Sequence, residues 1–282
     1  MTAAVETPTR RSRPRAISSL LTILAWLAAF LFFAPVLWMV MTSFKQESDA
    51  ASSPPSFLFS PTLEQYRTIF TSEAGGYFLN SLIATGVSTL LVLIMAVPAA
   101  YALSIRPVKR TQDVLFFFIS TKMLPIVAVI MPIYVIAGQI RMLDNIFTLI
   151  ILYTAMNLPI AVWMMRSFFL EVPGEVLEAA SMDGASLMLT MRRVLIPMVT
   201  PGIAATALIC VIFAWNEFFF ALNLTAANAA TVPIYLMSTM TSEGQFLAQL
   251  SAASVLASLP VVLAGWFAQK QLVRGLSMGA VK

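Results

Sequence analysis

The sequence has no histidine and only one cysteine among 282 residues. Transition-metal sites depend on histidine and on clustered cysteines, so this composition argues against a metal centre. The one cysteine, Cys210, lies in an apolar run and cannot form an internal disulfide. Charge is scarce too, because only 11% of the residues are charged and 59% are hydrophobic. A soluble domain has about 25% charged residues, so this composition indicates an integral membrane protein.

A phosphate-binding loop is also missing. No lysine follows a glycine anywhere in the chain, so the pattern G-x-x-x-x-G-K-[ST] that cradles the phosphates of ATP does not occur. The sequence offers no arrangement of a nucleophile with a base either. We therefore predict that this chain is not an enzyme and binds no cofactor and no nucleic acid.

Long apolar runs predict an all-α, polytopic membrane protein. A helix needs about 20 mostly apolar residues to cross a bilayer, and six runs of this kind occur, at residues 17–41, 80–104, 114–138, 146–165, 200–222 and 246–267. The first run is too long for a signal peptide, so we expect an uncleaved span. The chain then divides into a tail (1–16), a six-helix transmembrane region (17–270) and a second tail (271–282).

The loop after the first span contains the segment PTLEQYRTIF, which predicts a short amphipathic helix. Thr62 is placed to cap this helix, with Gln65 reaching back to complete a capping box.

The distribution of basic residues predicts the orientation. With the N-terminus in the cytoplasm, cytoplasmic segments hold 13 of the 17 lysines and arginines and the outside segments hold three. The cytoplasmic set is Arg10, Arg11, Arg13, Arg15, Arg106, Lys109, Arg110, Arg166, Arg192, Arg193, Lys270, Arg274 and Lys282. Because cytoplasmic loops carry an excess of Lys and Arg, we predict that both termini are cytoplasmic.

A polar stretch at residues 171–197 separates the fourth and fifth spans. It is too apolar for a flexible linker and too charged to cross a membrane. Val176, Leu177 and Ala180 form an apolar stripe at helical spacing. Glu175 and Glu178 lie near the expected start of this helix, where negative charge suits the helix dipole.

A glycine divides this stretch into two expected helices. Asp183-Gly184 ends the first, since glycine readily adopts the left-handed conformation of a helix end. Ser186 is placed to cap a second helix, which Pro197 is expected to close. Short helices are marginal in water alone, so this elbow needs a partner surface, either lipid headgroups or a protein. Periodicity alone is equally consistent with a stretch that only connects the two spans along the membrane interface.

Three segments of the stretch resemble the EAA motif of ABC importer permeases. They are Glu178-Ala179-Ala180, Asp183-Gly184-Ala185 and Val194-Leu195-Ile196-Pro197. The motif reads EAA, three residues, Gly, nine residues and I-x-L-P, and the spacing here is kept in full. Other segments are similar to carbohydrate-importer permeases related to the MalG subunit of the maltose transporter. These are PTLEQYRTIF, Asn80-Ser81, KMLP with Pro132, FAWNEFFFAL and QLVRGLSMGAVK.

The resemblance implies the type I permease fold of ABC importers, with the elbow as a cytoplasmic coupling-helix loop in a bacterial inner membrane. It implies a second, MalF-like permease, two MalK-like ATPase subunits that hydrolyse ATP, and an extracytoplasmic solute-binding protein. Glu178 would be the acidic contact to an ATPase, Ala179 and Ala180 would allow close approach, and Gly184 would form the elbow. The full set expected at this contact is Glu178, Ala179, Ala180, Asp183, Gly184 and Pro197.

Four polar residues in or near spans are candidates for the translocation pathway, because ionisable and polar groups inside a membrane are functional by default. Lys122 either faces the pathway or extends to an interface. Glu217, beside Asn216, either lines the outer cavity, contacts the binding protein or pairs structurally. Asn157 precedes Pro159 and either lines the pathway or joins two helices.

Two other classes of function remain. A self-sufficient secondary transporter or channel usually shows internal repeats and broken helices around charges at the midplane, and no convincing repeat occurs here. A membrane enzyme or assembly factor would need clustered His, Asp or Glu. For the substrate, the segment LSAASVLASLPVVLAGWFAQKQLVRGL looks most like polyol permeases.

Overall fold

The computed structural model describes residues 15–105, 109–241 and 244–279. Most of the described chain is helical, and one two-stranded antiparallel ribbon pairs Met240 with Gln245. The elements are α1 (Arg15–Thr42), α2 (Glu47–Ala50), α3 (Glu64–Thr71), α4 (Ala74–Ser104), α5 (Thr111–Met123), α6 (Ile126–Gln139), α7 (Ile146–Leu170), α8 (Gly174–Met182), α9 (Leu187–Thr190), the π-helical turn η1 (Met191–Leu195), α10 (Ile196–Trp215), α11 (Phe219–Leu224), α12 (Val232–Ser238), β1 (Met240–Thr241), β2 (Gly244–Gln245) and α13 (Leu247–Gly279).

Five described helical segments are long and apolar enough to cross a membrane: α1, α4, α7, the continuous α9–η1–α10 segment, and α13. A sixth span is formed if the bent pair α5–α6 counts as one. The all-α polytopic fold predicted from the sequence is therefore confirmed. Helix α13 continues to Gly279, so the start of the expected 271–282 tail is helical.

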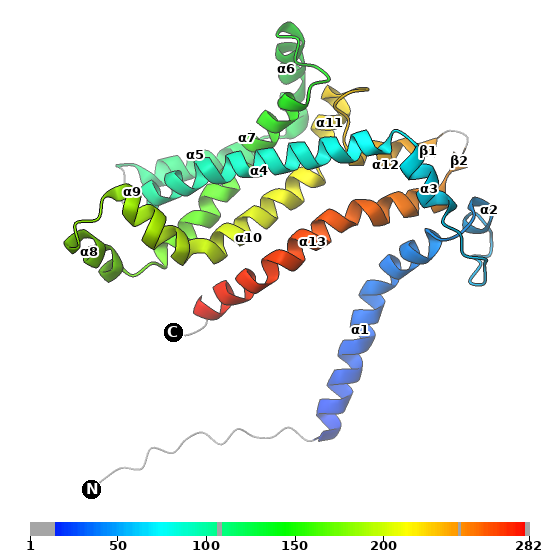
Figure 1. The fold of residues 1–282 in the computed structure, drawn as a ribbon, viewed down its shortest axis with the longest axis horizontal. Coiled ribbons are helices and arrows are strands. Elements are labelled where there is room, and N and C mark those ends of the chain that lie inside the picture. The colour runs from blue at the N-terminus through cyan, green and yellow to red at the C-terminus, as the bar shows by residue number, and fades with distance from the viewer. Residues whose placement is uncertain (1–14, 106–108, 242–243, 280–282) are drawn as a thin grey trace.

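The third span is not the straight helix expected over residues 114–138. Helices α5 and α6 meet at an angle of 88°. Leu124 between them is extended, with ψ 127°, because the residue before a proline is pushed out of the helical region. Pro125 thus ends α5, and α6 leaves in a new direction (Figure 1).

The expectation that Pro197 closes the second elbow helix is wrong. The helix that begins at Leu187 runs through η1 into α10 and ends at Trp215. The N–H of Ile196 donates to the Met191 carbonyl, the wider spacing of a π-helix. Pro197 therefore lies inside the continuous segment, directly after the π-turn, and has no backbone N–H to donate there. The expected fifth span, 200–222, accordingly ends earlier, and α11 is a separate short helix.

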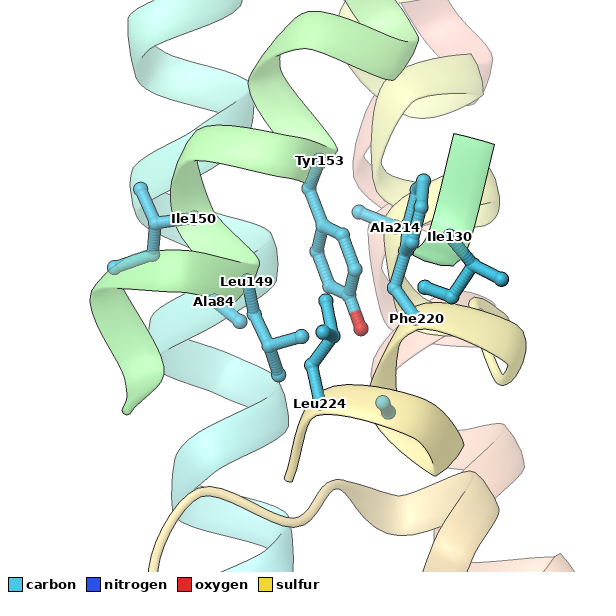
Figure 2. Close-up of a cluster of buried hydrophobic side chains, with 9 residues drawn as sticks. Ala84, Ile130, Leu149, Ile150, Tyr153, Ala214, Phe220 and Leu224 are labelled. Carbon is cyan, nitrogen blue, oxygen red and sulfur yellow. The ribbon is translucent and has the colours of Figure 1, made fainter. Parts of the chain in front are cut away.

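The core between α4, α7 and α10 consists of three successive buried layers, and two further clusters pack α13 against α3, α12 and the end of α10. Figure 2 shows the first layer, where the Tyr153 ring extends from α7 towards Phe220 and Leu224. Ala84 of α4 and Ala214 of α10 are also in this layer. Small residues of this kind let membrane helices approach closely, which accounts for the tight contact of α4 with its neighbours.

Helix α1 diverges from this bundle, and its C-terminal end packs against α13 (Figure 1). Its large side chains are exposed, including Trp26 (74%) and Phe32 (84%). Helix α2, which follows α1, is joined to α13, because the Glu47 carboxylate accepts hydrogen bonds from the backbone N–H groups of Ala248 (3.0 Å) and Gln249 (3.3 Å). This carboxylate satisfies two free donors at the start of α13.

The short amphipathic helix of the first loop exists as α3. The Thr62 hydroxyl accepts from the Glu64 N–H at 3.1 Å. The capping box with Gln65 does not form, since the Thr62 N–H donates to the Phe44 carbonyl instead and Gln65 is buried.

Candidate functional site

The elbow between α8 and α9 forms as the sequence predicts, and it lies at one end of the bundle (Figure 1). Gly184 has a left-handed φ of 71°. The N–H groups of Gly184 and Ala185 donate to the carbonyls of Ser181 and Ala180, both at 3.0 Å. This pattern is a Schellman motif, the common glycine-dependent end of a helix. The Ser186 hydroxyl then accepts from the Leu189 N–H at 3.4 Å and caps the next helix.

The residues expected to dock a partner divide between two faces of α8. Glu178 and Ala179 are exposed, as are Asp183 and Gly184 at the turn. Ala180 is buried (8% exposed) and so faces the bundle. The exposed set is completed by Pro197 beyond the elbow.

The inner side of the elbow is fixed to the helical core. Leu177 of α8 and Met191 of η1 pack against the third buried layer, which includes Tyr101 of α4, Phe169 of α7 and Leu195 of η1. The elbow is therefore packed against α4, α7 and the π-helical turn η1.

Two methionines at the elbow were not singled out from the sequence. Met182 is 90% exposed at the end of α8, and Met188 is 74% exposed in α9. Methionine side chains adapt their shape to a partner surface. The only sequence signal was their position on either side of the glycine turn.

The four candidates for the translocation pathway also divide into buried and exposed residues. Asn157 is fully buried, and its amide donates to the Cys210 carbonyl of α10 at 3.5 Å. Glu217 is 8% exposed, and its carboxylate accepts from the N–H groups of Phe220 (2.9 Å) and Ala221 (3.4 Å). Glu217 thereby caps α11, while Asn157 joins α7 to α10.

Lys122 and Asn216 lie at the surface of the subunit. The Lys122 ammonium, near the end of α5, donates to the Met156 carbonyl of α7 at 2.8 Å and lies 5.8 Å from the centroid of the Phe213 ring. Asn216 follows α10 and borders a cavity of about 310 Å³. A charged side chain within a membrane-spanning segment needs a polar or aqueous surrounding in the assembled protein.

A carboxylate clamp, formed by Asp144, holds the loop 224–232 at the other end of the bundle. Its oxygens accept from the N–H groups of Ala226 (2.8 Å) and Ala229 (3.0 Å) and from Asn228. Partial burial acts to raise the pKa of the Asp144 carboxyl, but these hydrogen bonds outweigh it and lower that pKa. Asn80 supports the same loop by donating to the carbonyls of Asn228 and Ala230.

The fold and the elbow define a multi-pass helical membrane protein that presents a rigid helix–turn–helix at one end. The chain belongs to the family described as binding-protein-dependent transport system inner membrane component, whose model matches residues 93–278. It is therefore a permease subunit of an ABC importer rather than an enzyme, and ATP hydrolysis takes place in a partner subunit.

Two curated relatives and one solved structure illustrate this membership. The chain is 39% identical to a probable ABC transporter permease, y4oR, of Sinorhizobium fredii, over 95% of this chain and 97% of that protein. It is 31% identical to the trehalose/maltose transport system permease MalG of Thermococcus litoralis, over 93% and 96%. A bacterial ABC transporter that imports the acidic polysaccharide alginate has the same fold, with a TM-score of 0.75 at 24% identity, covering 94% of this chain and 100% of that one.

Proposed function

We propose that this chain forms half of the translocation pathway of a carbohydrate importer and couples to an ATPase through its elbow. The observation that carries the proposal is the two-sided construction of α8. Glu178 and Ala179 face outward, while Leu177 of the same helix packs against the core of the bundle. One face is thus free for a partner and the other transmits its movement.

The chemistry of the outward face suits a groove with a basic side chain. Ala179 has a small side chain that permits close approach, and the Glu178 carboxylate offers a charge-assisted contact. A charge pair buried at such an interface is costly to break, at about 2–5 kcal/mol for truncating one partner. The proposed partners are two MalK-like ATPase subunits, a second MalF-like permease and an extracytoplasmic solute-binding protein.

The proposed orientation puts the elbow and both termini in the cytoplasm. The excess of basic residues in the segments on that side, 13 against three, supports it. The loop 224–232 then faces outward, towards the binding protein.

The proposed substrates are sugars or polyols. A trehalose/maltose permease is among the relatives that align over nearly their whole length, and the segment 250–276 resembles polyol permeases. Within this chain we assign the pathway surface to Lys122 and Asn216. Asn157 and Glu217, which are buried, support neighbouring helices of that surface.

The docking role is tested by Glu178→Lys in the complex co-expressed with its ATPase and second permease. We expect normal membrane insertion but loss of the co-purifying ATPase and of uptake, because the reversed charge repels a basic partner. Asp113→Lys is the matched control, since Asp113 is an exposed carboxylate in the first turn of α5, outside the stretch 171–197. Full ATPase recovery and uptake with Glu178→Lys would refute the proposed docking.

A further inference from the structure

The cavity beside Asn216 is built from elements far apart in the sequence. It lies between the end of α10, helix α12 and the first half of α13. Its volume of about 310 Å³ is at the lower end of the range for small-molecule sites, roughly 300–1,000 Å³. Val232 and Leu236 supply apolar walls, and Asn216, Ser254 and Ser258 supply polar groups.

The polar groups of this cavity keep unused hydrogen-bonding capacity. One N–H of the Asn216 amide donates to the Ile212 carbonyl at 2.8 Å, which leaves the amide oxygen and the second N–H. The Ser258 hydroxyl donates to the Val255 carbonyl at 2.7 Å and keeps its acceptor sites. Ser254 makes no side-chain hydrogen bond to any residue that the structure describes.

Trp215 makes one wall of the cavity rigid. Its indole N–H donates to the Ala257 carbonyl of α13 at 3.0 Å, and the side chain is only 5% exposed. This bond fixes the ring between α10 and α13, so the cavity is pre-formed rather than dependent on a rotating side chain.

An aromatic ring and a charged side chain lie on the surface next to the cavity. Phe213 lies three residues before Asn216, and residues at that spacing are neighbours on one helix face. Phe213 is 42% exposed, with the Lys122 ammonium 5.8 Å from its ring centroid. Lys122 uses one of its three N–H donors on the Met156 carbonyl. Phe213 and Lys122 do not line the cavity, but Phe213 neighbours Asn216, which does.

We propose that this cavity is a subsite for a polyhydroxylated solute, in which Asn216 and Ser254 form hydrogen bonds with the hydroxyl groups. The Lys122–Phe213 pair lies next to the cavity on the translocation pathway. The assignment rests on the proposed function of the chain in carbohydrate import. A chain of sugar hydroxyls provides donors and acceptors to Asn216, Ser254 and Ser258, whereas a lipid tail would leave their remaining hydrogen-bonding capacity unused. The carbon backbone of the sugar meets Val232, Leu236 and the fixed Trp215.

Cysteine labelling in the assembled complex tests this subsite. Cys210 is fully buried, so a charged methanethiosulfonate reagent should leave it unmodified. In lipid nanodiscs containing the second permease and the ATPases, Ser254→Cys should react, and sorbitol or maltose should slow the reaction. About tenfold slowing is expected when the sugar is at about ten times its Kd.

Betaine at equal osmolarity should give no protection, and Ser251→Cys, outside the cavity on α13, should show no protection with any solute.

A second substitution tests whether Asn216 forms a hydrogen bond with the sugar hydroxyl groups. Asn216→Ala in the Ser254→Cys background should raise the half-protecting sugar concentration about three- to tenfold, as for one lost hydrogen bond. Asn223→Ala is the matched control, because that amide also donates to a helix carbonyl but does not line the cavity. The half-protecting concentration should stay unchanged in the control.

Two results would overturn the subsite. If Ser254→Cys is unreactive in the complex but reactive in the isolated chain, a side chain of the second permease fills the cavity. If it reacts equally with and without both sugars, the cavity is wet but does not recognise hydroxyl groups. Co-purification of the ATPase and its stimulation by the binding protein, measured on the same samples, report separately on the proposed function.

Discussion

The Asp144 carboxylate binds Asn228 twice, although 84 residues separate them: one oxygen accepts from the Asn228 backbone N–H at 3.0 Å and from its side-chain amide at 2.8 Å. The other oxygen accepts from the N–H groups of Ala226 and Ala229. Asp144 itself has a left-handed φ of 53°. One side chain thus accepts hydrogen bonds from three residues of the loop 224–232.

Asp144→Ala should release this loop while leaving the elbow intact. The backbone N–H groups lose a charged acceptor, and we expect the free energy that stabilises the loop to fall by about 1–2 kcal/mol. The lower end applies because Ala226 and Asn228 are exposed and can bind water instead. Limited proteolysis of the complex should show faster cleavage at residues 224–232. Asp113→Asn, an exposed carboxylate in the first turn of α5, is the control. Equal cleavage in wild type and Asp144→Ala would contradict the clamp.

The same clamp should be insensitive to pH near neutrality. Its hydrogen bonds lower the pKa of the Asp144 carboxyl, so the ionised form is the one that stabilises the fold. That contribution is fully present above the ordinary carboxyl pKa of about 3.9 and disappears only as pH falls through the lowered value. Loop protection should therefore be constant between about pH 5 and 8. A loss of protection near pH 6 that Asp144→Asn abolishes would show that the carboxyl is not stabilised in this way.

Gly202 is expected to tolerate no side chain. A Cβ atom at this position in α10 would lie 2.3 Å from the Phe168 ring of α7, so Gly202→Ala must displace an aromatic side chain in a packed helix contact. Overpacking of this kind costs about 1–3 kcal/mol. Thermal unfolding in detergent, followed by size-exclusion chromatography, should show a lower melting temperature. Gly265→Ala is the control, because nothing lies within 4 Å of its added Cβ, and equal melting of the two variants would exclude the clash.

The parts of this structure that the sequence predicted depend on local signals. Gly184, Ser186 and the apolar residues Val176 and Leu177 lie within a few residues of one another, so turn and capping preferences suffice to place the elbow. Continuation of the second elbow helix past Pro197 was missed because a π-turn has no distinctive composition. The strong bend at Pro125 was missed because apolar spans often tolerate proline.

The contacts that the sequence did not predict join distant segments. Asp144 and Asn228 carry no pattern that pairs them, and Glu217 resembles any intramembrane carboxylate until its position before α11 is known. The burial of Asn157 against the Cys210 carbonyl also depends on how α7 packs on α10. Periodicity reports which residues are apolar, not which helix each residue faces.

Glu217 should act as a helix cap, and its substitutions distinguish this from a role in transport. Gln keeps one oxygen that can accept from the Phe220 N–H, whereas Ala leaves two N–H groups at the start of α11 without their acceptor. We expect Glu217→Ala to be about 1–3 kcal/mol less stable than Glu217→Gln in thermal unfolding. If instead Glu217→Gln melts like wild type but lowers uptake as much as Glu217→Ala, the negative charge itself serves transport.

The backbone at Gly184 provides the most specific test of the elbow. A Cβ atom added there meets nothing within 4 Å, so any effect of substitution arises from the left-handed φ of 71° and not from crowding. Valine is strongly disfavoured in this region, whereas asparagine tolerates it. Gly184→Val should therefore distort the turn and reduce ATPase co-purification and uptake, while Gly184→Asn should retain most of both. Both variants insert an exposed side chain at the same position, so equal loss in the two would mean that the surface at Gly184 is blocked. Wild-type coupling in Gly184→Val would show that coupling does not depend on the left-handed turn.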